Sequence, residues 1–493
     1  MTVLAHRTDT VTRDALAVLQ PGFEGTTAPA WLLRQVAEGL TAVGLFGRNI
    51  TSPEQLAALT AQLRAERGEV LVAIDEEGGD VTRLEARGGS SFPGNLALGA
   101  VDDTDLTRAV AHELGLRLAE CGVNLNWAPS ADVNSNPDNP VIGVRSFGAD
   151  THLAARHTAA YVEGLQTAGV AACTKHFPGH GDTNVDSHHA LPRIDVDLGT
   201  LQARELVPFK AAVAAGTKAV MSAHILVPAL DPTRPATLSP QILTGLLRKE
   251  LGYEGLIVTD GMEMHAIAGT YGIERGSVLA IAAGADAICV GGGLADEATV
   301  LRLRDALVAA VREGTLPEER LADAAARVRA LAEWTGAARP DARPEGSRAS
   351  GIGLAAARRA VAVTGSAAPL TTPYVATLAP VANIAVGDET PWGVAAELAA
   401  LLPGSACGVY PQGATAADVL AAAGDRTVVA VVRDAHRHPW MTEAVDALVA
   451  ARPDTVVVEM GLPRAEPRGA LYIATHGASR VCGRAAAEVI AGV

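Results

Sequence analysis

The stretch VAACTKHFPGHGDTNVDSHH, residues 170–189, decides how the fold of this chain is interpreted. Its first five residues form an apolar run that is typical of a buried strand. The rest contains a proline and two glycines, which exclude a regular helix, together with four histidines, two aspartates and a lysine. A polar loop that leaves a buried strand is where α/β proteins hold their reactive side chains. We therefore expect this segment to contribute to a functional site.

The same unit, an apolar run followed by polar residues, recurs along the first two thirds of the chain. Amphipathic segments such as Asp105–Cys121 and Gln241–Leu251 separate most of these units. Both a (β/α)8 barrel and a doubly wound open sheet produce such an alternation. The eight apolar runs predicted as strands are Leu16–Leu19, Val43–Phe46, Val70–Ile74, Val123–Asn126, Val170–Cys173, Ala219–Ser222, Leu256–Thr259 and Ala287–Val290.

The polar clusters distinguish these two α/β folds. They directly follow predicted strands, at residues 75–79, 129–132, 175–176, 224 and 260–261. In a barrel the carboxyl ends of all strands converge on one face, whereas an open sheet gathers only the ends at its switch point. Clusters after so many strands predict an α/β protein with a TIM-like (β/α)8 barrel.

A change in composition near residue 336 predicts two domains. The segment Pro317–Trp334 has the apolar stripe of a last barrel helix, so residues 1–336 are predicted as the barrel. Residues 337–350 are rich in arginine, proline, alanine, glycine and serine without periodicity, as expected of a linker. Residues 351–493 again alternate apolar runs with alanine-rich helical patterns, which predicts a smaller α/β sandwich domain.

Charge and cysteine content disfavour several classes of partner. The formal net charge of −15 over 493 residues argues against binding to nucleic acid or to an anionic membrane. The five cysteines are scattered and form no CxxC pair, as in proteins of a reducing compartment. We find no pattern of a secretion signal and no apolar run of the roughly 20 residues that a bilayer requires. These features predict a cytoplasmic protein with no nucleic-acid or membrane partner.

The loop within residues 175–189 is compatible with three kinds of site. A metal site is disfavoured because proline and glycine break the helical register that would align His176 with His180, and no HExxH motif occurs. In an acid–base site, Asp186 would fix the tautomer of His188, which would give or take a proton at Nε2. The third possibility is that these side chains only hydrogen-bond the loop backbone. Spacing alone leaves the last two interpretations balanced.

Other strand ends offer carboxylates and a cation. Asp260 follows an apolar run and precedes a glycine, which suits either a nucleophile in a cleft or a helix N-cap. With a proton donor from a neighbouring strand, it would complete the nucleophile and acid/base pair of a retaining glycosidase. Asp75 is the first acid past its strand and is placed to bind sugar hydroxyls. Arg145 lies on a proline-containing loop, where it either binds a ligand or holds the loop by a salt bridge.

Together these segments resemble glycoside hydrolase family 3, and specifically its β-N-acetylglucosaminidase branch. Residues 175–189 match the KHFPGHGDT…DSH signature of that branch. Further segments that look like those of the family follow in the family order, at residues 44–49, 75–79, 145–148, 221–224, 236–239 and 259–264. The resemblance covers roughly residues 17–335. Longer bacterial members of the family have a similar two-domain layout.

The resemblance implies roles for individual residues. Asp260 matches the nucleophile, and His188 matches the acid/base, with Asp186 as its partner in a catalytic dyad. The family more often has glutamine at the position of Glu76 and arginine at that of Asp80, which puts only contacts at the rim of the site in doubt. The residues that match those holding the nonreducing-end sugar are Asp75, Arg83, Arg145, Lys175 and His176.

The activity that the resemblance implies is that of a retaining exo-β-N-acetylglucosaminidase without metal or other cofactor. Its substrates would be small carbohydrates with terminal β-linked N-acetylglucosamine, such as cell-wall fragments or chitooligosaccharides. Because a neutral histidine would also admit inorganic phosphate, a phosphorylase is one alternative, and a β-glucosidase of the same family is another. A sugar-binding protein that has lost catalysis and a metal-dependent hydrolase are alternatives from other classes.

Overall fold

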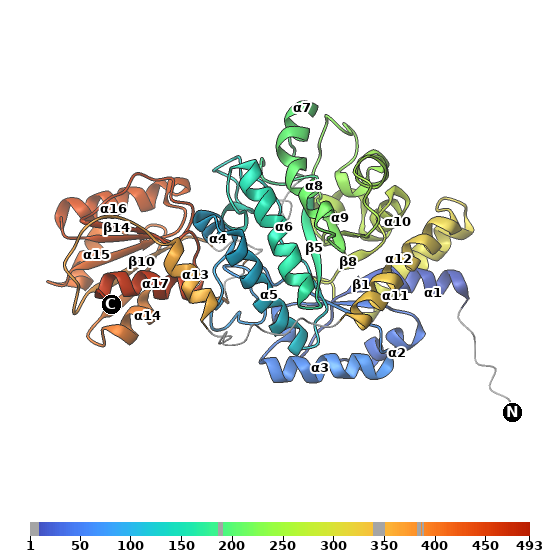
Figure 1. The fold of residues 1–493 in the computed structure, drawn as a ribbon, viewed down its shortest axis with the longest axis horizontal. Coiled ribbons are helices and arrows are strands. Elements are labelled where there is room, and N and C mark those ends of the chain that lie inside the picture. Colours follow the sequence, from blue (N-terminus) through green and yellow to red (C-terminus); the bar gives the residue numbers. More distant parts are fainter. Residues whose placement is uncertain (1–8, 186–190, 339–350, 382–385, 387–388) are drawn as a thin grey trace.

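A six-stranded β-sheet in each part of the chain, extended in the first part by a two-stranded sheet, organises the described residues (Figure 1). The computed structural model describes residues 9–185, 191–338, 351–381, 386 and 389–493. The first sheet and its helices, coloured from blue to yellow in Figure 1, lie beside the second part, coloured orange to red. None of the helices in these ranges is long and apolar enough to cross a membrane.

Eight short strands in the first part of the chain run parallel, close to the predicted apolar runs. From β2 to β7, each strand is hydrogen-bonded to the next one in chain order. A single bridge between Val258 and Ala287, the residue before β8, continues this series, and β8 pairs with β1. The predicted α/β fold with a curled parallel sheet is confirmed. Closure of the barrel between β1 and β2 stays a prediction. The strands are β1 (Leu19–Pro21), β2 (Ala42–Leu45), β3 (Leu71–Ile74), β4 (Leu125–Asn126), β5 (Ala171–Phe177), β6 (Ala219–Ser222), β7 (Leu256–Thr259) and β8 (Ile288–Val290).

The first sheet buries a different core on each face, because successive strand residues point to opposite sides. One core packs against the surrounding helices and is rich in branched residues such as Val72 and Ile257. The inner core on the opposite face also holds the larger side chains of Trp127, Val328 and Leu331. Alanines in or next to the strands line this inner core beside larger strand residues such as Leu71 and Met221; they are Ala42, Ala73, Ala171, Ala219 and Ala287.

Helices α1 to α12 accompany the first sheet, and α5 packs against α6. Two further segments, Leu201–Glu205 and Gln241–Glu250, are π-helical. The helices are α1 (Thr10–Ala17), α2 (Ala30–Glu38), α3 (Pro53–Glu66), α4 (Asn95–Val101), α5 (Thr104–Glu120), α6 (Thr151–Thr167), α7 (Leu198–Thr200), α8 (Leu206–Ala214), α9 (His265–Tyr271), α10 (Ile273–Ala283), α11 (Glu297–Arg312) and α12 (Glu318–Ala337).

Some predicted boundaries are wrong. The run Leu16–Leu19 is divided, because residues 16 and 17 end α1 and β1 begins at Leu19. A short apolar run is buried equally well as helix or strand, so its composition does not separate the two. Residues 175 and 176, predicted to open a loop, lie inside β5, which continues to Phe177. α12 continues to Ala337, beyond the predicted end of this helix at residue 334.

The second sheet has the order β11-β10-β12-β13-β14-β9, and its edge strand β9 runs antiparallel to β14. Helices α13, α14 and α17 pack on one face of this sheet, and α15 and α16 pack on the other. Its strands are β9 (Ala362–Gly365), β10 (Tyr374–Ala379), β11 (Ala406–Pro411), β12 (Val428–Val432), β13 (Val456–Glu459) and β14 (Leu471–Ala474). Its helices are α13 (Ile352–Ala360), α14 (Ala395–Leu401), α15 (Ala416–Ala423), α16 (Pro439–Ala451) and α17 (Arg480–Ala491).

Candidate functional site

Polar side chains from several strands meet at the carboxyl end of the first sheet. Asp75 directly follows β3, and Asp260 directly follows β7. Lys175 and His176 lie near the end of β5. Because these strands are parallel, their ends share one edge of the sheet. This edge is therefore the candidate site.

A buried carboxylate, Glu77, is at the centre of the charged cluster. Lys175 Nζ lies 2.7 Å from Glu77 Oε1 and 2.5 Å from Asp75 Oδ1. Arg145 donates to both Glu77 oxygens through Nε and Nη2, at 2.7 to 3.2 Å. Burial alone would raise the pKa of Glu77, but Arg145 and Lys175 outweigh burial and hold it at about 2. Glu77 is therefore a permanent anion that fixes two cations at the sheet edge.

Asp75 and Arg83 form the more open part of this cluster. Arg83 Nη2 lies 3.3 Å from Asp75 Oδ2, and 16% and 20% of the two side chains are exposed. Lys175, by contrast, is only 3% exposed. The cluster thus combines a buried, fully paired interior with two charged groups that solvent or a ligand can reach.

The loop between Asp75 and Arg83 is shaped by a second buried glutamate, Glu76. Its Oε2 accepts hydrogen bonds from the backbone N–H groups of Arg83 and Leu84, at 2.7 and 2.8 Å. Burial raises the pKa of Glu76 to about 7. The expectation that Glu76 and Asp80 affect only rim contacts is wrong, because their exposed fractions are 2% and 6%. Both carboxylates face the protein interior, where they organise the chain.

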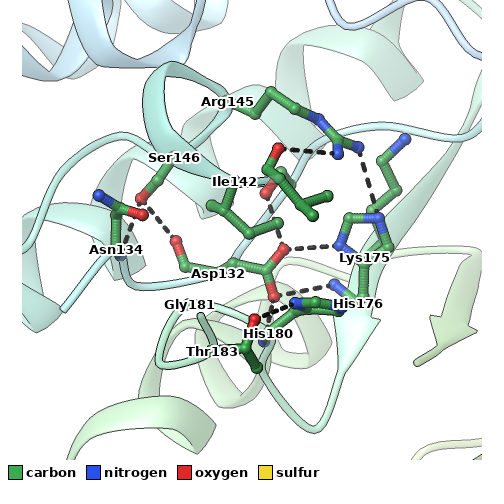
Figure 2. A network of polar contacts seen from close by, with 12 residues as sticks. Asp132, Asn134, Ile142, Arg145, Ser146, Lys175, His176, His180, Gly181 and Thr183 are labelled. Carbon is green, nitrogen blue, oxygen red and sulfur yellow. Dashed lines mark hydrogen bonds and ion pairs between the residues drawn. The ribbon is translucent and has the colours of Figure 1, made fainter. Parts of the chain in front are cut away.

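Asp132 holds the imidazole of His176 in place (Figure 2). His176 Nδ1 lies 2.6 Å from Asp132 Oδ2, and Ser130 Oγ donates to the same oxygen at 3.0 Å. The other oxygen accepts the backbone N–H groups of His176 and His180, at 3.2 and 2.7 Å. Burial opposes ionisation, but His176 outweighs it and holds the pKa of Asp132 well below its usual range. With Nδ1 bonded to Asp132, His176 presents Nε2 towards Arg145 Nη2, 3.4 Å away.

The polar loop after β5 is held by a neighbouring loop. Asn139 Nδ2 donates to the carbonyl oxygens of His180 and Gly181, at 2.9 and 3.1 Å, and Asn136 Nδ2 donates to that of Thr183 at 3.3 Å. Burial lowers the pKa of His180 to about 4, against smaller opposing effects of the charges on Asp132 and Asp260. His180 is therefore a neutral, buried part of the loop at physiological pH.

A carboxylate from another helical segment supports the same loop. Arg204 forms two ion pairs, one with Asp182 at 2.5 Å and one with Glu205 at 2.6 Å. Gly179 has a φ of +120°, which favours glycine, and a Cβ atom built on it would lie 2.7 Å from Glu205 Oε2. Burial raises the pKa of Glu205 to about 7, although Arg204 opposes the shift. Asp182 is thus engaged with an arginine.

Asp260 projects from a short turn after β7. Its backbone N–H donates to the carbonyl of Ser222 at 3.2 Å, and the N–H of Gly261 donates to Asp260 Oδ1 at 2.8 Å. His224 Nε2 lies 2.9 Å from the carbonyl oxygen of Gly261, and its Nδ1 lies 2.8 Å from Thr237 Oγ1. Asp260 is half-buried. The turn therefore carries a partly accessible carboxylate on a backbone that β6 and β7 fix.

The structure brings together five predicted residues, Asp75, Arg83, Arg145, Lys175 and His176. Two others, Asp186 and His188, lie outside the described residues, so the catalytic dyad stays a prediction. Within the described ranges, no three His, Cys, Asp or Glu side chains form a group that could hold a metal ion.

Sequence reasoning missed the supporting roles of Glu77, Asp132 and Asn139. Asp132 had a usable signal, because it stands in the polar cluster that follows β4. For Asn139, no local pattern distinguishes an amide that binds a distant loop from one on the surface.

A family model matches the part of the chain that carries this site, and two known proteins are similar to this chain. Residues 27–331 match the model of the glycosyl hydrolase family 3 N terminal domain. β-Hexosaminidase A of Pseudoalteromonas piscicida is 37% identical over 312 residues, which are 58% of this chain and 52% of that protein. The chain thus spans about half the length of this relative. A β-hexosaminidase of Chromobacterium violaceum is 38% identical over 253 residues, covering 50% of this chain and 70% of the relative.

One solved structure is similar over almost the whole chain, and another is similar over about two thirds of it. A glycoside hydrolase family 3 β-N-acetylglucosaminidase from Paenibacillus sp. str. FPU-7 has a TM-score of 0.88 and 35% identity, covering 98% of this chain and 97% of that one. A β-N-acetylhexosaminidase from Beutenbergia cavernae has a TM-score of 0.60 and 29% identity, covering 66% of this chain and 100% of that one.

Proposed function

Because this chain belongs to glycoside hydrolase family 3, we propose that it is a retaining exo-β-N-acetylglucosaminidase. It would remove terminal β-linked N-acetylglucosamine from small carbohydrates, namely cell-wall fragments or chitooligosaccharides. The observation that carries the proposal is the cluster in which buried Glu77 fixes Lys175 and Arg145 beside the more open Asp75 and Arg83. An exo-acting glycosidase needs such a rigid polar pocket to hold the nonreducing-end sugar.

In the proposed reaction, the glycosyl group is transferred from the glycosidic oxygen to the carboxylate of Asp260, and then from Asp260 to water. His188, oriented by Asp186, donates a proton to the glycosidic oxygen while Asp260 attacks the anomeric carbon. The bond from that carbon to the leaving oxygen breaks, and a covalent glycosyl-Asp260 ester forms. Water then attacks the same carbon, His188 accepts its proton, and Asp260 leaves, so the configuration is retained.

The remaining predicted residues would hold the sugar. Asp75 would accept hydrogen bonds from hydroxyl groups, and Arg83, Arg145 and Lys175 would donate them. His176 is oriented for the same role because Asp132 fixes its Nδ1. Two cations already paired with Glu77 keep their positions without substrate, so little ordering cost remains when the sugar binds.

We also propose that the chain divides into a catalytic (β/α)8 barrel at residues 1–336, a linker at 337–350 and an α/β sandwich domain at 351–493. The strand order β2 to β8, with β8 paired to β1, supports a barrel in the first part. The family match over residues 27–331 falls inside that part.

A comparison of substrates that differ only at C2 tests the proposal. Aryl β-N-acetylglucosaminides should be cleaved at least about 100-fold faster, in kcat/KM, than the matching β-glucosides, because buried polar groups that miss a partner are costly. Equal or faster cleavage of the glucosides would mean a β-glucosidase. Turnover that a chelator abolishes would point to a metal-dependent hydrolase instead.

The acid/base assignment has its own test. His188→Ala should slow substrates with poor leaving groups by about 10²–10⁴-fold and barely affect formation of the glycosyl-enzyme from nitrophenyl substrates. Asp186→Asn should show a milder version of this pattern. Equal losses for all leaving groups would show that His188 has a structural role only.

Inorganic phosphate stays a candidate acceptor for the second step. A neutral histidine does not repel an anion as a carboxylate would. Phosphorus NMR of the products at millimolar phosphate separates the two outcomes. A sugar 1-phosphate would identify a phosphorylase, and free sugar alone would identify a hydrolase.

A further inference from the structure

The second part of the chain contacts the loop that carries Asp75 and Arg83. Asp80 lies on this loop, and its Oδ2 is 2.5 Å from Arg433 Nη2. Its Oδ1 accepts a hydrogen bond from the backbone N–H of Ala478 at 2.7 Å. Only 2% of the Asp80 side chain and 14% of the Arg433 side chain are exposed. One buried carboxylate thus ties the loop after β3 to two separate loops of the second sheet.

Those two loops follow the carboxyl ends of two strands of the second sheet. Arg433 comes directly after β12, and Ala478 lies in the segment between β14 and α17. Glu459, the last residue of β13, fixes the loop after β12 by accepting the N–H groups of Asp434 and Ala435, at 2.8 and 3.1 Å. Arg433 is therefore presented to Asp80 from a firmly held backbone.

A second set of contacts reaches the loop that carries Arg145. His436 Nε2 lies 2.9 Å from the carbonyl oxygen of Pro137. Leu462, just after β13, packs in a buried cluster with Leu96 and Val144. Val144 is the residue before Arg145. Strand-end loops of the second sheet thus touch both loops that carry candidate sugar-binding side chains.

We propose that the second part of the chain positions the sugar-binding residues, with Arg433 as a positioning residue that acts on Asp75 and Arg83 through Asp80. The inference deepens the proposed function and rests on it. Arg433 is engaged with Asp80 and lies over the ring of Trp392, 5.8 Å from its centre. Its effect on a substrate therefore passes through the β3 loop. A displacement of about 1 Å in such a loop costs up to roughly 10²-fold in rate or affinity.

The test compares Arg433→Met with a matched variant, Arg359→Met. Arg359 also joins the two parts of the chain, with Nη1 2.8 Å from Oδ2 of Asp103, the N-cap of α5. That pair lies outside the loops of the site. For 4-nitrophenyl β-N-acetylglucosaminide, Arg433→Met should raise KM about tenfold or more and change kcat less than about threefold, as expected for lost uniform binding. Arg359→Met should leave both parameters unchanged.

This division between KM and kcat separates positioning from general destabilisation. A smaller folded fraction lowers the apparent kcat and leaves KM unchanged, which is the opposite pattern. Asp80→Asn should reproduce the rise in KM, and the double variant should add little to it because both residues act through one contact. Arg433→Lys, which keeps the charge, should restore most of the affinity. An unchanged KM in Arg433→Met and Asp80→Asn would overturn the proposal.

Hydrogen exchange gives a readout that needs no substrate. The backbone N–H of Glu77 donates to Val81 and that of Gly79 donates to Phe92, both at 3.0 Å. Exchange across residues 77–84 should accelerate at least about tenfold in Arg433→Met and stay unchanged in Arg359→Met. Unchanged exchange in this segment would also overturn the proposal. If the wild-type protein cleaves no N-acetylglucosaminide, the proposed function fails, and exchange alone then decides whether Arg433 orders the loop.

Discussion

The two ends of the first sheet each bury a carboxylate among several cations, yet only one end has the features of a binding site. At the amino-terminal end, Asp286 is fully buried and lies 2.5 Å from Arg320 and 3.9 Å from Arg327. It also binds Arg248 and accepts the backbone N–H of Ile257 at 2.9 Å. At the carboxyl end, Glu77 is buried between Arg145 and Lys175.

The difference lies in where each carboxylate is placed. The partners of Asp286 are arginines of α12 and of Gln241–Glu250, and 13% to 30% of their side chains are exposed. The partners of Glu77 continue to Asp75 and Arg83, which are partly exposed. A buried ion pair alone therefore does not identify a functional site. Partly exposed partners occur at both ends, so exposure does not identify the site either; its place at the carboxyl ends of parallel strands does.

The largest expected effect is at the carboxyl end. Asp260→Ala should lower kcat by on the order of 10⁴-fold or more, because it removes the proposed nucleophile, and it should leave the fold intact. Mass spectrometry after reaction with a slow, mechanism-based N-acetylglucosamine analogue should place the adduct on Asp260 in the wild-type protein. An adduct on another carboxylate, or a variant of near-normal rate, would contradict the assignment.

Glu77→Gln should damage both activity and stability. Removing the anion leaves Lys175 and Arg145 without their shared partner, which should cost about 3 kcal/mol in the free energy of unfolding. Because these cations also belong to the proposed sugar-binding site, kcat/KM per folded molecule should fall by roughly 10²-fold. Chemical denaturation and steady-state kinetics measure the two effects separately. If Glu77→Gln is destabilised but keeps full activity, then Glu77 serves stability alone, as Asp286 is expected to do.

Asp286→Asn is the matched change at the amino-terminal end. It should also cost about 3 kcal/mol in the free energy of unfolding, because three arginines lose a buried anion. At a temperature where the variant is folded, however, kcat/KM should stay within about twofold of the wild-type value. A large kinetic loss would show that the amino-terminal cluster is coupled to the site.

The smallest expected effect concerns pH. Burial raises the pKa of Glu76 in the folded protein to about 7, from an ordinary value of 4.5. The folded state thus binds this proton more tightly, so the free energy of unfolding should fall as pH rises through this range. Glu76→Gln keeps an oxygen that can accept the N–H groups of Arg83 and Leu84 and removes the titration. From pH 5 to pH 8, the free energy of unfolding of Glu76→Gln should fall by roughly 2 kcal/mol less than that of the wild-type protein.

Denaturation curves at the two pH values, analysed as a difference between variant and wild type, isolate the contribution of Glu76. Neighbouring Glu77 should behave in the opposite way, because its pKa is held at about 2. Its stabilising effect is present above its ordinary pKa and disappears only as pH falls towards 2. Equal pH dependence in Glu76→Gln and the wild-type protein would mean that Glu76 is already ionised when folded.

Local sequence patterns predicted the strand positions and the strand-end carboxylates, because alternation of apolar and polar residues is a local property. The family predicted from the motifs is confirmed by the match over residues 27–331. The boundary at β5 was wrong because Lys175 and His176 are polar, yet they occupy strand positions whose charges are paired. The contact of Asp80 with Arg433 joins residues 353 positions apart, and no local pattern encodes such a pairing.

The small side chains that line the inner core have a consequence for how the chain folds during synthesis. Alanines such as Ala42 and Ala171 leave space that Val328 and Leu331 of α12 help to fill, and β1 pairs with β8. A growing chain exposes this unfilled interior until α12 has left the ribosome. β1 cannot pair until β8 has been made, and pairing between strands so far apart in the sequence is slow. Folding of the first part of the chain is therefore completed late, after α12, which ends at Ala337, has emerged.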